Sequence, residues 1–158
     1  MKANSIYLYT DGSSLGNPGP GGYGFILEWV GMSYKKEFSA GYKHTTNNRM
    51  ELMAVIVGLE SIKNPGMEVI VYSDSKYVVD AIEKKWLFSW DQKNFKGKKN
   101  KDLWERFLIV YNKHKVLFQW VKGHNKHPQN ERCDELAVKA AKGKILLSDV
   151  IFEQTDKD

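Results

Sequence analysis

The chain has 158 residues, 42% of them hydrophobic and 27% charged, which is ordinary for one soluble globular domain. No apolar run approaches the roughly 20 residues of a membrane span, and the single cysteine, Cys133, excludes an internal disulfide and favours a cytoplasmic location. The net charge is only +5, but residues 84–101 hold seven lysines and one acid, and this basic segment suggests a polyanionic partner.

Three strands are predicted in the first part of the chain. Residues 6–11 are rich in aromatic and apolar side chains, which is typical of a strand. The many glycines and prolines of residues 12–22 predict a loop. Residues 23–30 and 32–42 predict two more strands, and only Gly31 separates them, which indicates a tight hairpin.

Helices and strands alternate in the remainder. Thr46 or Asn47 can cap a helix that ends near residue 62, just before the helix-breaking sequence Asn-Pro-Gly. The further predicted elements are a central strand at 68–74, a helix from a Ser75 cap to residue 83, a helix at 101–114, a strand at 116–121 and a helix at 130–142.

This order of elements predicts an α/β fold. We expect a five-stranded mixed sheet, with three antiparallel strands and two parallel ones, and helices on both faces. Residues 1–147 are expected to form this single domain, and residues 148–158 to form a flexible acidic tail.

Four acidic residues lie where predicted strands end or predicted helices begin: Asp11, Glu51, Asp74 and Asp134. Carboxylates beside a core are costly unless something positive compensates them. Paired carboxylates can act as general acid and base without metal, as in glycoside hydrolysis. Alternatively, an all-carboxylate site can hold two Mg²⁺ ions about 4 Å apart for phosphoryl transfer. The number of acids and the basic segment favour the metal site, although each acid alone is better explained as a cap or turn residue.

Four stretches of the sequence resemble the motifs of type 1 ribonuclease H in its bacterial form, and they occur in the family's order. They are TDGSSLGNPGPGGYG (10–24), TTNNRMELM (45–53), SDS (73–75) and WVKGHNKHPQNERCDELA (120–137). The similarity extends from about residue 6 to residue 142. It implies an endonuclease that hydrolyses the RNA strand of RNA–DNA hybrids without strong sequence specificity, leaving 5′-phosphate and 3′-hydroxyl ends.

The resemblance also implies the catalytic residues and the cofactor. Asp11, Glu51, Asp74 and Asp134 match the metal-binding carboxylates of a two-metal-ion mechanism, and His124 matches a mobile histidine that assists proton transfer or product release. The implied cofactor is Mg²⁺, two ions with substrate bound, for which Mn²⁺ substitutes. The protein is expected to act as a monomer on a hybrid duplex.

Contacts with the hybrid are expected from two regions. The minor groove of an A-like hybrid displays 2′-hydroxyls, which short polar groups can contact. Lysines interleaved with aromatic rings are typical of a non-specific nucleic-acid surface. The candidate contact residues are Asn17, Thr46, Asn47, Asn48, Lys76, Trp86, Trp90, Phe95, Lys96, Lys98, Lys99 and Asn100. Of these, Thr46 and Asn100 are implied by the resemblance alone, as members of the family's pocket for a DNA phosphate. The alternative is a solvated lysine face whose aromatic rings belong to the core.

Some features depart from the family pattern. His44 stands where an arginine helps to hold a DNA phosphate in the best-known form, and Lys76 stands where glutamine is frequent. The stretch between Phe95 and Asp102 is also a few residues short. Two rival functions are considered: another nuclease on the same fold, such as a junction resolvase, and a non-catalytic hybrid-binding module. The first is not expected to match these long motifs, and the second is expected to lack a carboxylate.

Overall fold

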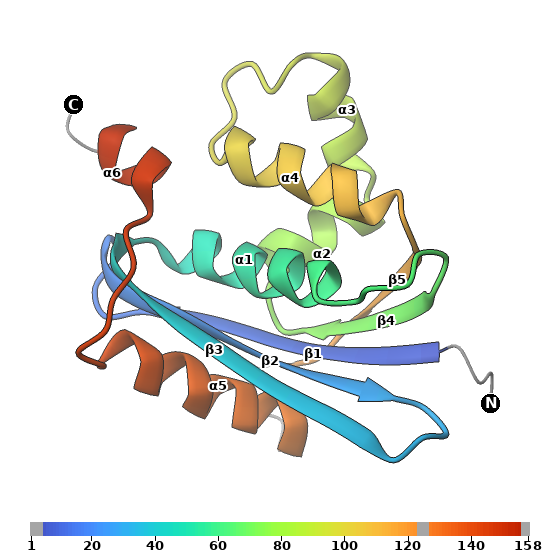
Figure 1. Ribbon diagram of the computed structural model, residues 1–158. Coiled ribbons are helices and arrows are strands. Elements are labelled where there is room, and N and C mark those ends of the chain that lie inside the picture. The colour runs from blue at the N-terminus through green and yellow to red at the C-terminus, as the bar shows by residue number, and fades with distance from the viewer. Residues whose placement is uncertain (1–4, 123–126, 156–158) are drawn as a thin grey trace.

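The computed structural model describes residues 5–122 and 127–155 and contains one mixed sheet within them (Figure 1). The strands are β1 (Ser5–Ser14), β2 (Gly19–Trp29), β3 (Tyr34–Thr45), β4 (Glu68–Ser73) and β5 (Lys115–Trp120), in the spatial order β3-β2-β1-β4-β5. β1, β2 and β3 are antiparallel neighbours, whereas β4 is parallel to β1 and β5 is parallel to β4. The predicted five-stranded mixed sheet is therefore confirmed.

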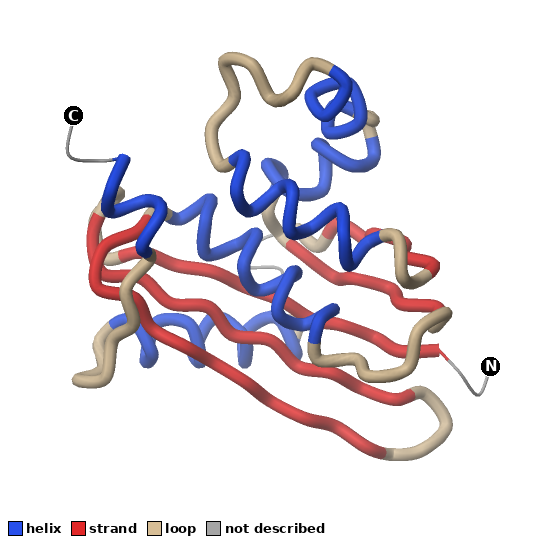
Figure 2. The backbone as a smooth tube through the Cα atoms, turned by 45° about the horizontal axis from the view of Figure 1, so that its top comes forward, coloured by secondary structure: helices blue, strands red, loops and turns tan. Residues whose placement is uncertain are grey.

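Helices cover both faces of the sheet, as predicted (Figure 2). The helices are α1 (Asn47–Glu60), α2 (Lys76–Glu83), α3 (Trp86–Gln92), α4 (Lys101–Tyr111), α5 (Pro128–Ala141) and α6 (Val150–Thr155). α5 packs on one face against β1, β2 and β3, and α1 packs on the other face between the sheet and α4. None of the helices in the described parts of the chain is long and apolar enough to cross a membrane.

The main core lies on the α1 face of the sheet. Residues of α1 on almost every side of the helix are buried, because one side contacts the sheet and the other contacts α4. Trp104 and Phe107 of α4 are fully buried against this helix layer. Thr46 caps α1 by accepting a hydrogen bond from the backbone N–H of Arg49, at 3.2 Å. This packing fixes the start of α1 next to the ends of β1 and β4.

The glycine-rich stretch differs from its prediction as a loop. β1 continues to Ser14 and β2 begins at Gly19, so only residues 15–18 lie outside strands. The reason is close helix packing: a Cβ at Gly24 would lie 2.7 Å from the carbonyl oxygen of Cys133 in α5. The glycines therefore let the helices approach the paired strands, which is a tertiary requirement rather than a turn signal.

Other differences from the sequence prediction concern the connections and the C-terminal region. The turn after β2 comprises residues 30–33 rather than Gly31 alone, and α3 was not predicted. The helix expected at 101–114 ends at Tyr111. The region from Ser148, predicted to be a loose tail, contains α6, and the carboxylate of Asp149 is buried against Arg49.

Candidate metal centre

Three of the four predicted carboxylates converge in the structure. Asp11 lies in β1, Glu51 in the second turn of α1, and Asp74 directly after β4. β1 and β4 are parallel neighbours whose last paired residues are Tyr9 and Tyr72, so Asp11 and Asp74 each lie two residues beyond that pair. One oxygen from each of the three side chains lies within 4.8 Å of the others. The predicted convergence of these three acids is confirmed.

Gly12 holds two of these carboxylates in place. Its backbone N–H donates to Oε1 of Glu51 at 2.6 Å and to Oδ1 of Asp11 at 3.0 Å. A Cβ at position 12 would lie 2.3 Å from the backbone of Met50 and Glu51. Only glycine therefore allows α1 to approach β1 closely enough for Glu51 to join Asp11.

The three carboxylates are poorly compensated by the protein itself. Burial, together with the charge of Asp74, raises the pKa of Asp11 to about 8. Burial and the charges of Asp11 and Asp74 raise the pKa of Glu51 well above its ordinary value. Oδ1 of Asp74 is buried and has no hydrogen-bond partner in the described parts of the chain. A hard divalent cation matches this set, because it prefers carboxylate oxygens and supplies the missing positive charge.

The fourth predicted carboxylate, Asp134, and the predicted histidine, His124, are not part of this group of three. Asp134 lies in α5 with an exposed side chain and is outside the group of three, although its charge contributes to the raised pKa of Asp11. His124 lies outside the described residues. The structure therefore brings three of the expected catalytic side chains together and leaves Asp134 at their edge.

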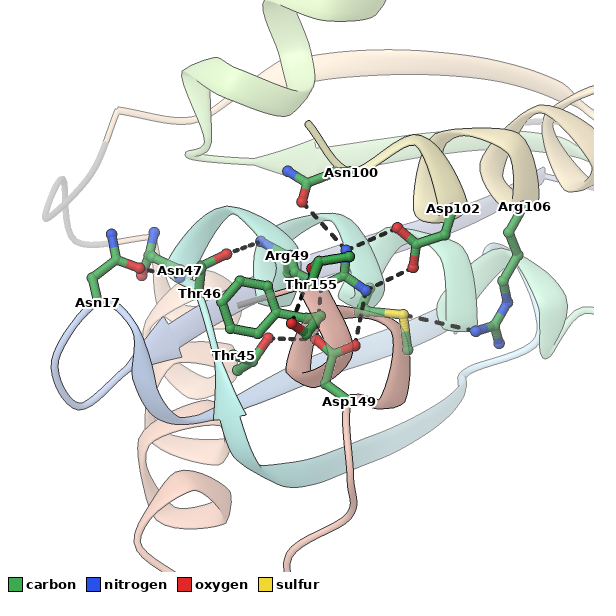
Figure 3. A network of polar contacts seen from close by, with 12 residues as sticks. Asn17, Thr45, Thr46, Asn47, Arg49, Asn100, Asp102, Arg106, Asp149 and Thr155 are labelled. Carbon is green, nitrogen blue, oxygen red and sulfur yellow. Dashed lines mark hydrogen bonds and ion pairs between the residues drawn. The ribbon is translucent and has the colours of Figure 1, made fainter. Parts of the chain in front are cut away.

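Two polar segments meet beside the carboxylates at the start of α1. Asn17, between β1 and β2, accepts a hydrogen bond through Oδ1 from the backbone N–H of Asn47, at 3.0 Å (Figure 3). Asn48, the next residue of α1, is exposed. The structure thus places three of the candidate hybrid contacts on one surface.

The basic segment combines exposed lysines with rings of differing burial. Lys96, Lys98 and Lys99 are exposed, and Trp86 is 45% exposed. Trp90 is half-buried against Trp104, with the ammonium of Lys98 5.2 Å from its ring centroid.

The expectation that Phe95 contacts nucleic acid is wrong, because its side chain is only 3% exposed and belongs to the core. Its backbone N–H donates to the carbonyl of Trp90 at 2.7 Å in a turn that directs the ring inward. For Phe95, the alternative that the aromatic ring belongs to the core is therefore correct.

Lys76 lies two residues after Asp74, at the start of α2. Its side chain is exposed, and its ammonium lies 4.3 Å from the ring centroid of Trp120 at the end of β5. The Trp120 ring thus holds the ammonium of Lys76 at the end of β5.

Sequence reasoning missed a buried arginine between the candidate contacts Thr46 and Asn100. Arg49 is 3% exposed and binds two carboxylates, Asp102 of α4 and Asp149 before α6 (Figure 3). The available signal was an arginine inside the apolar face of a predicted helix, which requires acidic partners. Those partners are 53 and 100 residues away in sequence, so the sequence did not identify them.

Comparison with known proteins matches this arrangement to one family. The family model described as RNase H matches residues 3–142. A ribonuclease H of Lachnoclostridium phytofermentans is 54% identical over 157 residues, covering 94% of this chain and 99% of that protein. A ribonuclease H of Escherichia coli O9:H4 is 51% identical over 146 residues, covering 89% of this chain and 92% of that protein.

Solved structures show the same fold. LC9-RNase H1, described as a type 1 RNase H with the type 2 active-site motif, superposes with a TM-score of 0.82 at 33% identity, covering 98% of this chain and 82% of that chain. LC11-RNase H1, solved in complex with RNA/DNA hybrid, superposes with a TM-score of 0.65 at 27% identity, covering 86% of this chain and 96% of that chain.

Proposed function

Because the chain belongs to the ribonuclease H family, we propose that its converging carboxylates hydrolyse the RNA strand of an RNA–DNA hybrid with bound divalent metal. As a member of this family the chain is a hydrolase, a ribonuclease H that acts on RNA–DNA hybrids. The observation that supports the catalytic centre is the approach of one oxygen each from Asp11, Glu51 and Asp74 to within 4.8 Å, with Oδ1 of Asp74 left without a partner among residues 5–122 and 127–155.

Each residue of the centre has a definable task. Asp11 and Asp74 are fixed by neighbouring parallel strands, and Glu51 is fixed by α1 and by the N–H of Gly12. These three carboxylates would hold the metal, and through it would orient the scissile phosphate. When bound, two Mg²⁺ ions supply activation of water and stabilisation of the leaving 3′ oxygen, with Mn²⁺ as an alternative ion.

The proposal extends to residues at the edge of the centre. Asp134 completes the metal set from α5, since its charge already influences Asp11. His124, from the same motif, acts as the proton carrier, because histidine titrates near neutral pH. The products carry 5′-phosphate and 3′-hydroxyl ends. The proposed location is the cytoplasm, which the single cysteine supports. The proposed working form is a monomer, because one chain carries the centre and both hybrid-contact regions.

Hybrid binding is assigned to the polar surface at the start of α1 and to the basic segment. Asn17, Asn47 and Asn48 suit the 2′-hydroxyls of a wide minor groove. The exposed lysines suit phosphates, while Trp86 packs on sugar or base. Thr46, Asn100 and Lys76 are proposed as further phosphate contacts. Lys76 is exposed at the start of α2, two residues after Asp74.

Cleavage of matched duplexes tests the proposed function. Labelled RNA–DNA, RNA–RNA and DNA–DNA duplexes of one sequence are incubated with the protein, with Mg²⁺ or with excess chelator. We expect cleavage only of the RNA strand of the hybrid and only with metal. Cleavage of either control duplex at a similar rate, or hybrid cleavage in chelator, contradicts the proposal.

Replacing Lys96, Lys98 and Lys99 together by alanine is expected to weaken hybrid binding. These lysines are exposed and none is assigned to the metal site, so KM should rise while kcat stays within a few-fold. Each lost phosphate contact should reduce the log–log salt slope of binding by about 0.9. The measurement is the hybrid dissociation constant at several salt concentrations.

The control replaces three exposed lysines on the α5 side of the sheet, Lys139, Lys142 and Lys144, by alanine. This control makes the same change in net charge far from the basic segment, and its effect should be much smaller. Equal effects of the two triple variants would show that only net charge matters and that the basic segment is a solvated face.

A further inference from the structure

The C-terminal strap, defined as residues 149–155, is anchored at a buried arginine. Oδ2 of Asp149 accepts from Nε of Arg49 at 2.7 Å, and Oδ1 accepts from Nη2 at 2.8 Å. The hydroxyl of Thr45 also donates to Oδ2 at 2.7 Å. Asp149 is 8% exposed, so these are interior contacts rather than a loose surface ion pair. The strap lies outside residues 3–142, the part matched by the family model.

The same arginine holds the end of the basic segment. Nη1 and Nη2 of Arg49 donate to the carboxylate of Asp102 at 2.9 and 2.7 Å, and Nη1 also donates to Oδ1 of Asn100 at 3.3 Å. Asn100 has a left-handed backbone, with φ of 66°, and is the residue at which the lysine-rich loop enters α4. Figure 3 shows these side chains meeting at Arg49 from α1, α4 and the strap.

All five N–H donors of Arg49 are used in these contacts, since Nε makes one bond and the two terminal nitrogens make two each. Arg49 therefore has no donor left for a phosphate. Its role must be to connect the strap to α4. The ring of Phe152 in α6 covers the guanidinium, with 5.7 Å between the ring centroid and Cζ.

A cavity of about 620 Å³ separates the strap from the basic segment. Its walls include Lys98, Lys99, Asn100 and Lys101 on one side and Ile151, Phe152 and Thr155 on the other. The strap therefore faces the lysines across an open, basic cavity, and Arg49 lies in the cavity wall.

We propose that the C-terminal strap positions the basic segment for hybrid binding, with Asp149 acting as a positioning residue through Arg49, Asp102 and Asn100. The inference rests on the proposed function, because it assumes that the basic segment binds the hybrid. Without Asp149, two of the Arg49 donors lose their acceptors, and the side chain is free to leave Asn100 and Asp102. The loop that carries the lysines then loses its fixed entry into α4.

The direction in which Asp149→Asn changes hybrid affinity separates this proposal from simple electrostatics. Asp149→Asn removes one negative charge from behind the Arg49 wall of the cavity, so electrostatics alone strengthens binding of a polyanion. A positioning role makes the same variant bind more weakly. Glu105→Gln is the matched control, because Glu105 is exposed, lines the same cavity and forms no hydrogen bond or ion pair within the described residues.

The experiment measures the affinity for fluorescent hybrid in an Asp11→Asn background, so that the hybrid stays intact. Asp149→Asn is expected to raise the dissociation constant about tenfold, the equivalent of one charged hydrogen bond, and to flatten its salt dependence. Glu105→Gln is expected to bind as tightly as the parent or more tightly. In the active background, KM should rise for Asp149→Asn while kcat stays within a few-fold.

Stability is controlled in two ways, because breaking a buried ion pair destabilises the fold. Ile62→Ala removes a buried side chain after the end of α1 and should lower Tm without changing hybrid affinity. Phe152→Ala removes the ring over Arg49 but keeps the Asp149–Arg49 hydrogen bonds. It therefore loosens the packing of the strap without removing its anchor, and it should weaken binding less than Asp149→Asn does.

Two results would overturn the proposal. In the first, Asp149→Asn, folded at the assay temperature, binds hybrid as tightly as the parent or more tightly. In the second, Ile62→Ala weakens binding as much as Asp149→Asn does. Failure of the proposed function looks different, since the parent itself then neither binds nor cleaves the hybrid.

Discussion

Asp11→Asn is expected to abolish hybrid cleavage while the chain remains folded. The carboxylate of Asp11, in β1, and that of Glu51 both accept a hydrogen bond from the backbone N–H of Gly12. The amide in the variant keeps the shape of the Asp11 side chain but not its charge. A neutral ligand weakens binding of a hard divalent cation, which prefers charged oxygens. The rate of cleavage of labelled hybrid in Mg²⁺ is the measurement, and Asp74→Asn should give the same loss.

The same variant is expected to be more stable than the parent in excess chelator. The pKa of Asp11 is raised to about 8 in the folded protein, against 3.8 as its ordinary value. The folded state therefore holds this proton more tightly, and ionisation of Asp11 contributes a loss of stability to the parent as the pH rises from about 4 to about 8. Asp11→Asn removes that loss. Its Tm should exceed that of the parent at pH 8 by at least about 2–4 °C, the shift for about 1 kcal/mol in a domain of this size.

In Mg²⁺ the parent should become more stable than Asp11→Asn, which is the reverse of the order in chelator. If Mg²⁺ binds the folded parent as proposed, it should raise the Tm of the parent, whereas Asp11→Asn should gain little. Glu83→Gln, an exposed acid at the end of α2, is the control for the change in charge and should behave as the parent does. Full cleavage by Asp11→Asn, or a Tm of the variant that does not exceed that of the parent at pH 8 in chelator, would contradict this account.

His124→Ala is expected to slow turnover by about 10²–10⁴-fold, the usual contribution of a positioned proton-transfer group. Mg²⁺ binding should change little, because the proposed metal centre consists of the three converging carboxylates and does not need His124 as a ligand. The measurements are kcat at saturating hybrid and the Mg²⁺-induced rise in Tm.

His127→Ala is the comparison from the same motif. His127 accepts the backbone N–H of Asn130 at the start of α5, so its loss should lower stability and leave kcat within a few-fold. If His124→Ala eliminates the Mg²⁺-induced rise in Tm, His124 is a metal ligand and the proton-transfer role is wrong.

The mixed sheet and the convergence of three carboxylates followed from local sequence patterns, whereas the strand order β3-β2-β1-β4-β5 came from the structure. Hairpin-joined strands and helix-joined strands each restrict how the chain can pair, and parallel neighbours bring their carboxyl ends to one edge. The cap at Ser75 was also predicted, and Thr46 was one of two caps predicted for α1, because a cap depends on a hydrogen bond within three residues. The long motifs identified the family for the same reason: they are continuous in the sequence.

Only the tertiary structure decided the features that depend on residues far apart in the chain. Gly12 and Gly24 lie in strands because helices from elsewhere approach them within contact distance. Phe95 is buried because a turn directs it inward to the core. Arg49 is bound on both sides by acids 53 and 100 residues away, so the C-terminal segment predicted to be loose is an anchored strap. Burial and ion pairing of this kind are set by packing between elements, and no local pattern in the sequence encodes the partner.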